Sequence, residues 1–114
     1  MAGRIKHTVK RDLDLIKQEV EKEFKLPLKI KIRDRYHVDV KRVFIALILF
    51  VYNDIREKLG SRKVTLTTLS NYLGYESHAS ISLHLVNSHK GGIGLEEYLM
   101  GTKRLRESYL KLRS

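Results

Sequence analysis

Apolar residues recur at helical spacing near the start of the chain. Five of them are separated by steps of four, three, four and four, and so form one stripe of a helix: Val9, Leu13, Ile16, Val20 and Phe24. Charged residues fill most of the other positions. The pattern predicts an amphipathic helix of about 16 residues that Thr8 caps and that ends near Lys25, just before Pro27.

The next segment alternates between apolar and basic residues with a period of two, over residues 28–33 (LKIKIR). This alternation is typical of a strand, but no second segment of the kind is available to pair with it. The sequence therefore predicts either an extended arm or an edge strand that pairs with another copy. We call residues 28–35 the basic arm, after its four cations Lys29, Lys31, Arg33 and Arg35.

The most apolar run covers ten residues, 43–52. A helix that crosses a bilayer needs about twenty, so this run predicts a buried helix and no membrane partner. We expect the helix to begin at or near Asp39, to end near Leu59, and to have Gly60 as its C-cap. Because its centre is apolar on all faces, other helices should surround it.

Three further helices are predicted in the second half of the chain. Thr65 is expected to cap the first, over residues 66–73, and Gly74 to end it. The second covers residues 77–89 and turns Ile81 toward the core. The third runs from Leu95 to Leu112, with Gly101 as a weak point. Its expected buried residues are Leu95, Leu99, Leu105, Tyr109 and Leu112.

These elements predict an all-α fold of about five helices with one isolated extended arm or strand. The linkers are short, so we expect a single domain over residues 1–114. Residues 1–35 would supply an N-terminal helix and the basic arm. Residues 36–114 would form the core.

Two helices joined by a short turn within residues 65–89 are typical of a helix-turn-helix, whose second helix enters the major groove of DNA. Residues 77–89 carry Ser, His and Asn but no Lys or Glu. Such side chains both donate and accept hydrogen bonds and can approach base edges closely. An ordinary polar surface helix is the other interpretation.

The segment GYESHASI, residues 74–81, resembles a motif in the DNA-binding domain of the bacterial replication initiator DnaA. The similarity covers roughly residues 33–112, and the same arrangement of helices occurs in the Trp repressor superfamily. It implies that His78 reads bases, that Ala79 and Ser80 follow as the family's hydroxyl positions, and that Arg62 and Lys63 reach a minor groove. Ala79 departs from the family pattern, and no GxxxxGK[ST] motif is present, so the initiator's ATPase is not implied.

Charge agrees with a polyanionic partner. The 114 residues include 23 Lys and Arg against 13 Asp and Glu, a net charge of +10. Residues 1–36 hold eleven of these cations and six of the acids, whereas residues 61–90 hold three and one. Affinity would therefore come mainly from the N-terminal helix and the basic arm, and specificity from the uncharged face of residues 77–89.

The sequence offers little support for a disulfide scaffold, a metal site or an enzyme. There is no Cys, which excludes a disulfide scaffold, a Cys-based zinc finger and a thiol nucleophile. His78, His84 and His89 are spaced six and five apart, so they do not share a helical face and predict no metal site. Adjacent Ser–His pairs diverge on a helix, so we expect no enzyme, no cofactor and no small-molecule substrate. The glycine-rich turn at residues 91–94 either joins two helices or holds a phosphate.

We therefore expect a double-stranded DNA-binding protein that acts as a transcription regulator or accessory replication factor, of the kind that phages and plasmids encode. It would be cytoplasmic and associated with the nucleoid, since no signal peptide is expected. The residues expected to read bases are Ser77, His78, Ser80, Ser82 and Asn87. Those expected at phosphates or in the minor groove are Arg62, Lys63, Thr65, Thr67, Lys90, Lys29, Lys31, Arg33 and Arg35.

Three questions stay open. The N-terminal helix and basic arm could form a homodimer, fold back on their own core, or lie along the DNA backbone. The whole fold could instead serve as an adaptor or inhibitor that binds protein. An RNA-binding role is third, without a stacking platform of aromatic residues in its favour.

Overall fold

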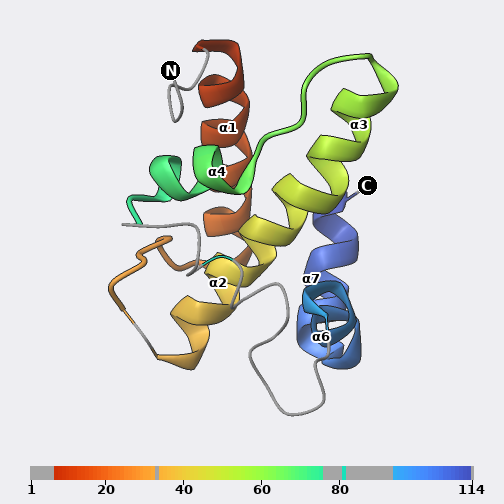
Figure 1. The fold of residues 1–114 in the computed structure, drawn as a ribbon. Coiled ribbons are helices and arrows are strands. Elements are labelled where there is room, and N and C mark those ends of the chain that lie inside the picture. The colour runs from red at the N-terminus through yellow and green to blue at the C-terminus, as the bar shows by residue number, and fades with distance from the viewer. Residues whose placement is uncertain (1–6, 33, 76–80, 82–93, 114) are drawn as a thin grey trace.

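The computed structural model describes residues 7–32, 34–75, 81 and 94–113 (Figure 1). In chain order its elements are α1 (His7–Phe24), α2 (Arg35–Ala46), the π-helical segment η1 (Leu47–Tyr52), α3 (Asn53–Lys58), α4 (Leu66–Leu73), α6 (Leu95–Gly101) and α7 (Lys103–Arg113). The described ranges contain no strand, which confirms the all-α expectation for this part of the chain. The radius of gyration is 13.5 Å, close to the value of about 13 Å for a compact fold of this length.

The first helix matches its apolar stripe. Four of the five stripe residues are buried and Ile16 is half-buried. The helix begins one residue before Thr8, and it ends where Lys25 takes a positive φ of 56°. The sequence pattern therefore predicted both the helix and its buried face.

The second helix begins earlier than expected. Asp34, not Asp39, is its N-cap: the carboxylate accepts a hydrogen bond from the His37 backbone N–H at 3.1 Å and lies 2.7 Å from His37 Nδ1. Asp39 lies one turn inside α2 and is buried. Both aspartates are good caps, and the sequence alone does not distinguish them.

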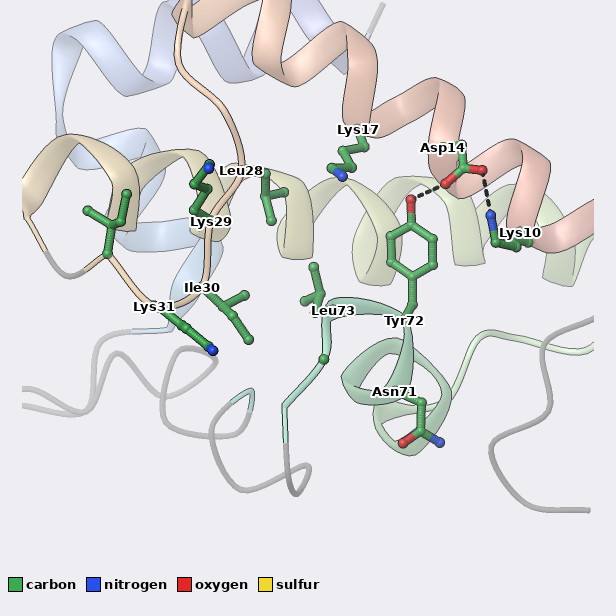
Figure 2. Close-up of a pocket in the computed structure, with 12 residues that line it drawn as sticks. Lys10, Asp14, Lys17, Leu28, Lys29, Ile30, Lys31, Asn71, Tyr72 and Leu73 are labelled. Carbon is green, nitrogen blue, oxygen red and sulfur yellow. Dashed lines mark hydrogen bonds and ion pairs between the residues drawn. The ribbon is translucent and has the colours of Figure 1, made fainter.

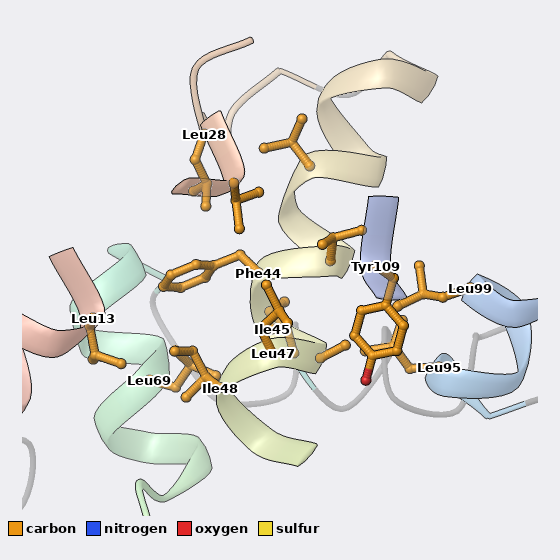
Figure 3. Packing of buried hydrophobic residues seen from close by; sticks show 14 of the residues in the cluster. Leu13, Leu28, Phe44, Ile45, Leu47, Ile48, Leu69, Leu95, Leu99 and Tyr109 are labelled. Atoms are coloured by element: carbon orange, nitrogen blue, oxygen red, sulfur yellow. The ribbon is translucent and has the colours of Figure 1, made fainter. Parts of the chain in front are cut away.

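α2, η1 and α3 follow one another without a break and form one long helix from Arg35 to Lys58. Residues 43–48 are all buried, on every face of the helix. Figure 3 shows this segment between side chains of α1 and α4 on one side and of α6 and α7 on the other. The expectation of a central helix surrounded by others is confirmed, and burial of these residues supplies much of the hydrophobic stabilisation.

The long helix ends as predicted. Gly60 has a φ of +75°, a left-handed conformation that costs other residues energy. Its N–H donates to Glu57 O at 3.0 Å, and the N–H of Ser61 donates to Arg56 O at 2.8 Å. These two bonds satisfy carbonyls at the end of the helix and send the chain away from its axis.

The basic arm is not a strand. Its described residues form an irregular segment with a turn at Ile30 and Lys31. Leu28 is buried and Ile30 is half-buried, while Lys29 and Lys31 are exposed. The arm thus folds back on its own core, with its apolar residues inward and its lysines outward. Arg35 belongs to α2 and not to the irregular segment.

The last helix is two helices, not one. Thr102 has φ −110° and ψ 117°, an extended conformation that separates α6 from α7. The interruption follows Gly101, the predicted weak point. Leu95, Leu99, Leu105 and Tyr109 are buried as expected, and Leu112 is half-buried. Among the described helices, none is both long and apolar enough to cross a membrane.

Candidate nucleic-acid interface

The short helix α4 has a defined start and end. Thr65 caps it by accepting a hydrogen bond from the Thr68 N–H at 3.1 Å. Gly74 ends it with a φ of +88°, and the N–H groups of Gly74 and Tyr75 both donate to Ser70 O. Both termini agree with the sequence prediction. The Thr65 hydroxyl is thus occupied with capping and orients the first turn of α4.

The basic loop, residues 61–63, leads into α4 and is anchored just before it. Asn53 is buried in α3 and bonds both backbone groups of Val64, donating to its carbonyl at 2.9 Å and accepting from its N–H at 2.7 Å. Arg62 and Lys63 are exposed beside this anchor. Lys63 forms an ion pair of 3.0 Å with Glu57, which is also exposed.

A groove of about 740 Å³ lies between α1, the basic arm and the C-terminal end of α4 (Figure 2). We call it the lysine groove. Lys29 and Lys31 enter it from the arm, and Lys10 and Lys17 from α1. Leu28, Ile30 and Leu73 line it with apolar surface, and Asn71 and Gly74 lie at its edge on α4.

The acid in the lysine groove is neutralised locally. Asp14 accepts hydrogen bonds from the Tyr72 hydroxyl and from Lys10, the latter at 3.0 Å. These bonds hold the pKa of Asp14 below its usual value, with the Tyr72 bond as the larger cause. Burial, together with the bond to Asp14, raises the pKa of Tyr72. The remaining lysines therefore leave the groove with net positive charge.

The Tyr72 ring also connects this groove to the core. It stacks on Phe44 of α2, with ring centroids 5.9 Å apart. One side chain thus fixes α4 to both the long helix and α1. Contacts of this side chain with the core thus help to set the orientation of α4.

The structure brings some of the predicted residues together and separates others. Lys29 and Lys31 lie beside the C-terminal end of α4. Arg62, Lys63 and Thr65 precede its N-terminus, and Thr67 is exposed on its first turn.

Arg35 lies apart from both groups, at the start of α2, where its charge acts on the buried Asp39. Ile81 is helical and buried, as predicted. The remaining predicted residues lie outside the described residues: Arg33, Ser77, His78, Ser80, Ser82, Asn87 and Lys90.

Sequence reasoning missed the α1 side of the lysine groove. Lys10, Asp14 and Lys17 are spaced four and three apart, which places them on one face of α1, beside the buried stripe. That spacing was a readable signal. The missing information was that α4 and the basic arm meet this face, which only the tertiary packing determines.

The described part of the chain holds no group of three or more His, Asp or Glu side chains that could bind a metal ion. The candidate interface therefore consists of α4, the basic loop and the lysine groove. Their chemistry is that of hydrogen-bond donors and lysine and arginine cations. Comparison of the chain with protein families, with curated proteins and with solved structures finds no match.

Proposed function

We propose that this protein binds double-stranded DNA through a helix-turn-helix made of α4 and residues 77–89. The second helix would lie in the major groove, with Ser77, His78 and Ser80 nearest the base edges. In the cell it would regulate transcription or act as an accessory replication factor. No ATPase is part of the proposal.

The observation that carries this proposal is the turn after α4. Gly74 ends the helix in a left-handed conformation, and seven residues later Ile81 is helical and buried at 0% exposure. A short capped helix, a left-handed glycine at its end and a buried helical residue seven positions later agree with a helix-turn-helix. The resemblance of residues 74–81 to the DnaA motif, and the net charge of +10, support the same interpretation.

The test is selection of duplex DNA from a random-sequence pool, followed by titration of the selected duplex. His78→Ala should relax the base preference, because a base contact carries sequence information. Arg62→Gln should weaken all sequences about equally, since a backbone contact does not. Lys22→Gln is the matched control, because Lys22 is exposed on α1 and belongs neither to the basic loop nor to the lysine groove.

Three outcomes would contradict the proposal. The first is an unchanged base preference in His78→Ala, which would remove residues 77–89 from the role of reading helix. The second is equal or tighter binding of single-stranded DNA or RNA. The third is a wild-type protein that selects no sequence.

A second candidate function is assembly with another copy of this chain. An apolar groove of about 270 Å³ lies between α1, the long helix and the end of α7. Leu15 and Ile55 line it and are each about half exposed, at 54% and 51%. Glu19 and Arg113 also line it, and a two-fold contact would bring Glu19 of one copy toward Arg113 of the other, in addition to the ion pair of 3.6 Å that Arg113 forms with Glu96.

Sedimentation velocity tests this second candidate. The wild type should sediment as a dimer and Leu15→Glu as a monomer, because a carboxylate in the centre of an apolar contact would be desolvated without a partner. Leu110→Glu is the control, since Leu110 is also exposed but does not line this groove. A monomeric wild type would exclude the assembly.

A further inference from the structure

We propose that the lysine groove binds the sugar-phosphate backbone of one DNA strand, at one edge of the major groove, while the basic loop binds the other strand at the opposite edge. The inference rests on the proposed function and adds to it a second contact surface. It assigns new roles to Lys17 and Asn71, which sequence reasoning did not include.

The charge of the lysine groove is available to a ligand. Asp14 already has Lys10 and Tyr72 as partners. Among the described residues, Lys17, Lys29 and Lys31 form no ion pair. Three lysines that converge on one groove match the phosphates of a nucleic-acid strand better than they match a single small anion.

The basic arm presents its lysines on a fixed backbone. The N–H of Leu28 donates to the Glu21 carboxylate at 2.6 Å. The buried Lys41 ammonium donates to Ile30 O at 3.0 Å and to Ile32 O at 3.2 Å. Because these bonds hold the backbone of residues 28–32, binding would cost this backbone little further freedom.

The spacing of the two cationic surfaces fits a duplex. The basic loop precedes the N-terminus of α4, and the lysine groove lies at its C-terminal end. A helix of eight residues rises about 12 Å, which is also about the width of the major groove of B-DNA. The two surfaces can therefore face phosphates of the two strands across that groove.

The position of the lysine groove favours a DNA strand over an acidic peptide. Asn71 and Gly74 form its edge, and the chain passes from Gly74 directly into the proposed reading segment. A strand whose bases meet residues 77–89 would have its backbone next to this edge. The Asn71 amide, exposed on α4, can then donate a hydrogen bond to a phosphate oxygen.

The experiment measures how duplex affinity depends on salt. The test protein carries Lys17→Gln, Lys29→Gln and Lys31→Gln. The matched control carries Lys22→Gln, Lys25→Gln and Lys103→Gln, three exposed lysines outside the groove with the same loss of charge. A third protein carries Lys17→Arg, Lys29→Arg and Lys31→Arg, which keep the charge. Circular dichroism and the thermal midpoint confirm that each is folded.

Loss of the groove contacts should reduce the slope of log K against log salt by about 0.9 for each phosphate released, or about 2.7 if all three lysines take part. The control should keep the wild-type slope, and the Arg protein should restore it. Ethylation interference should then show lost phosphate contacts on one strand for the groove protein, and on the other strand for Arg62→Gln with Lys63→Gln.

The outcomes separate the two proposals. A wild type that binds duplex DNA with sequence preference, and a groove protein with an unchanged slope, would overturn the groove assignment alone. The groove assignment would also be overturned if the groove protein and the protein with Arg62→Gln and Lys63→Gln lost phosphate contacts on the same strand. A wild type that binds an acidic peptide but no duplex would overturn the proposed function together with the groove.

Discussion

Asn53 and Val64 are joined by two hydrogen bonds that mimic a pair of backbone bonds. The Asn53 amide donates to Val64 O at 2.9 Å and accepts from Val64 N at 2.7 Å, and both residues are buried. This pair holds the end of the basic loop against α3 and so fixes the entry to α4. The residues are eleven apart in sequence, across the Gly60 turn.

Asn53→Ala should lower the free energy of unfolding by about 2–3 kcal/mol, because it leaves the buried N–H and C=O of Val64 without partners. Urea unfolding measures this. Asn71→Ala, at an exposed amide on α4, should change stability by less than about 0.5 kcal/mol. Equal losses in the two variants would mean that the Asn53 bonds contribute nothing specific.

The contact that Glu23 makes between α1 and α7 should weaken in acid. Lys111 forms an ion pair with it at 2.9 Å and Ser108 donates to it at 3.2 Å, and the Lys111 bond is the main cause that lowers the pKa of Glu23 below 4.5. A carboxyl with a lowered pKa stabilises the fold above its ordinary pKa and loses this effect as pH falls through the lowered value.

Glu23→Gln should therefore be less stable than wild type at pH 7, and the difference should shrink as the pH falls below about 4.5. Thermal unfolding from pH 7 to pH 3 tests it. Glu107→Gln, at an exposed position on α7, the helix that carries Lys111, should follow the wild-type curve throughout. A difference that does not change with pH would assign the loss to packing.

The contribution of Asp39 to stability should depend on pH in the opposite direction. Burial raises its pKa above 3.8, and the charge of Arg42 and a hydrogen bond from Tyr98 only partly offset this. Because the folded state disfavours the ionised form, Asp39→Asn should raise the free energy of unfolding at pH 7. The gain should disappear below about pH 4, where aspartate is protonated in both states. Asp54→Asn, at an exposed position, should give no such gain.

Gly74→Ala should destabilise the protein by about 1–2 kcal/mol, because its φ of +88° is unfavourable for any residue with a Cβ. The cost is conformational, since the nearest atom to a new Cβ would be Ile30 Cδ1 at 3.8 Å, an ordinary contact. Gly101→Ala is the matched control. It has open space and no positive φ, so it should be neutral or stabilise by up to about 1 kcal/mol.

Lys41→Met should release the basic arm. The substitution removes two hydrogen bonds to backbone carbonyls from a nearly buried ammonium, and we expect a loss of about 2 kcal/mol or more. Hydrogen exchange should show faster exchange at the amides of residues 30–32. Lys29→Met, on the exposed side of the arm, should leave both stability and exchange close to wild type. Unchanged exchange in Lys41→Met would mean that apolar contacts alone hold the arm.

Local signals predicted the helices wherever they were unambiguous. α4 has the bounds that Thr65 and Gly74 predict, because a cap and a left-handed glycine act within a few residues. The start of α2 was wrong because Asp34 and Asp39 are chemically equivalent as caps. The separation of α6 from α7 depends on the backbone of Thr102, and Gly101 alone indicated only a weak point.

The candidate site was less predictable because it is made by packing. The alternation of Leu28 to Ile32 shows which side chains turn inward, but the same pattern suits a strand and an arm folded on its own core. The choice depended on Lys41, a residue about ten positions away, and on Glu21 of α1. That Lys17 and Asn71 line one groove likewise depends on the position of α4 on α1, for which the sequence has no local signal.

The π-helical segment η1 determines how the two ends of the long helix are rotated relative to each other. Each residue of an α-helix turns the chain by about 100°, and a π-turn takes up one residue more than an α-turn. If the same residues of Leu47–Tyr52 were wound as a regular α-helix, the extra residue would rotate α3 by about that angle against the apolar half. Asn53 would then face away from Val64, and Tyr52 away from Asp12, to which its hydroxyl donates at 2.7 Å. The single wide turn thus lets Tyr52 reach Asp12 and Asn53 reach Val64 from the same helix whose other half is buried in the core.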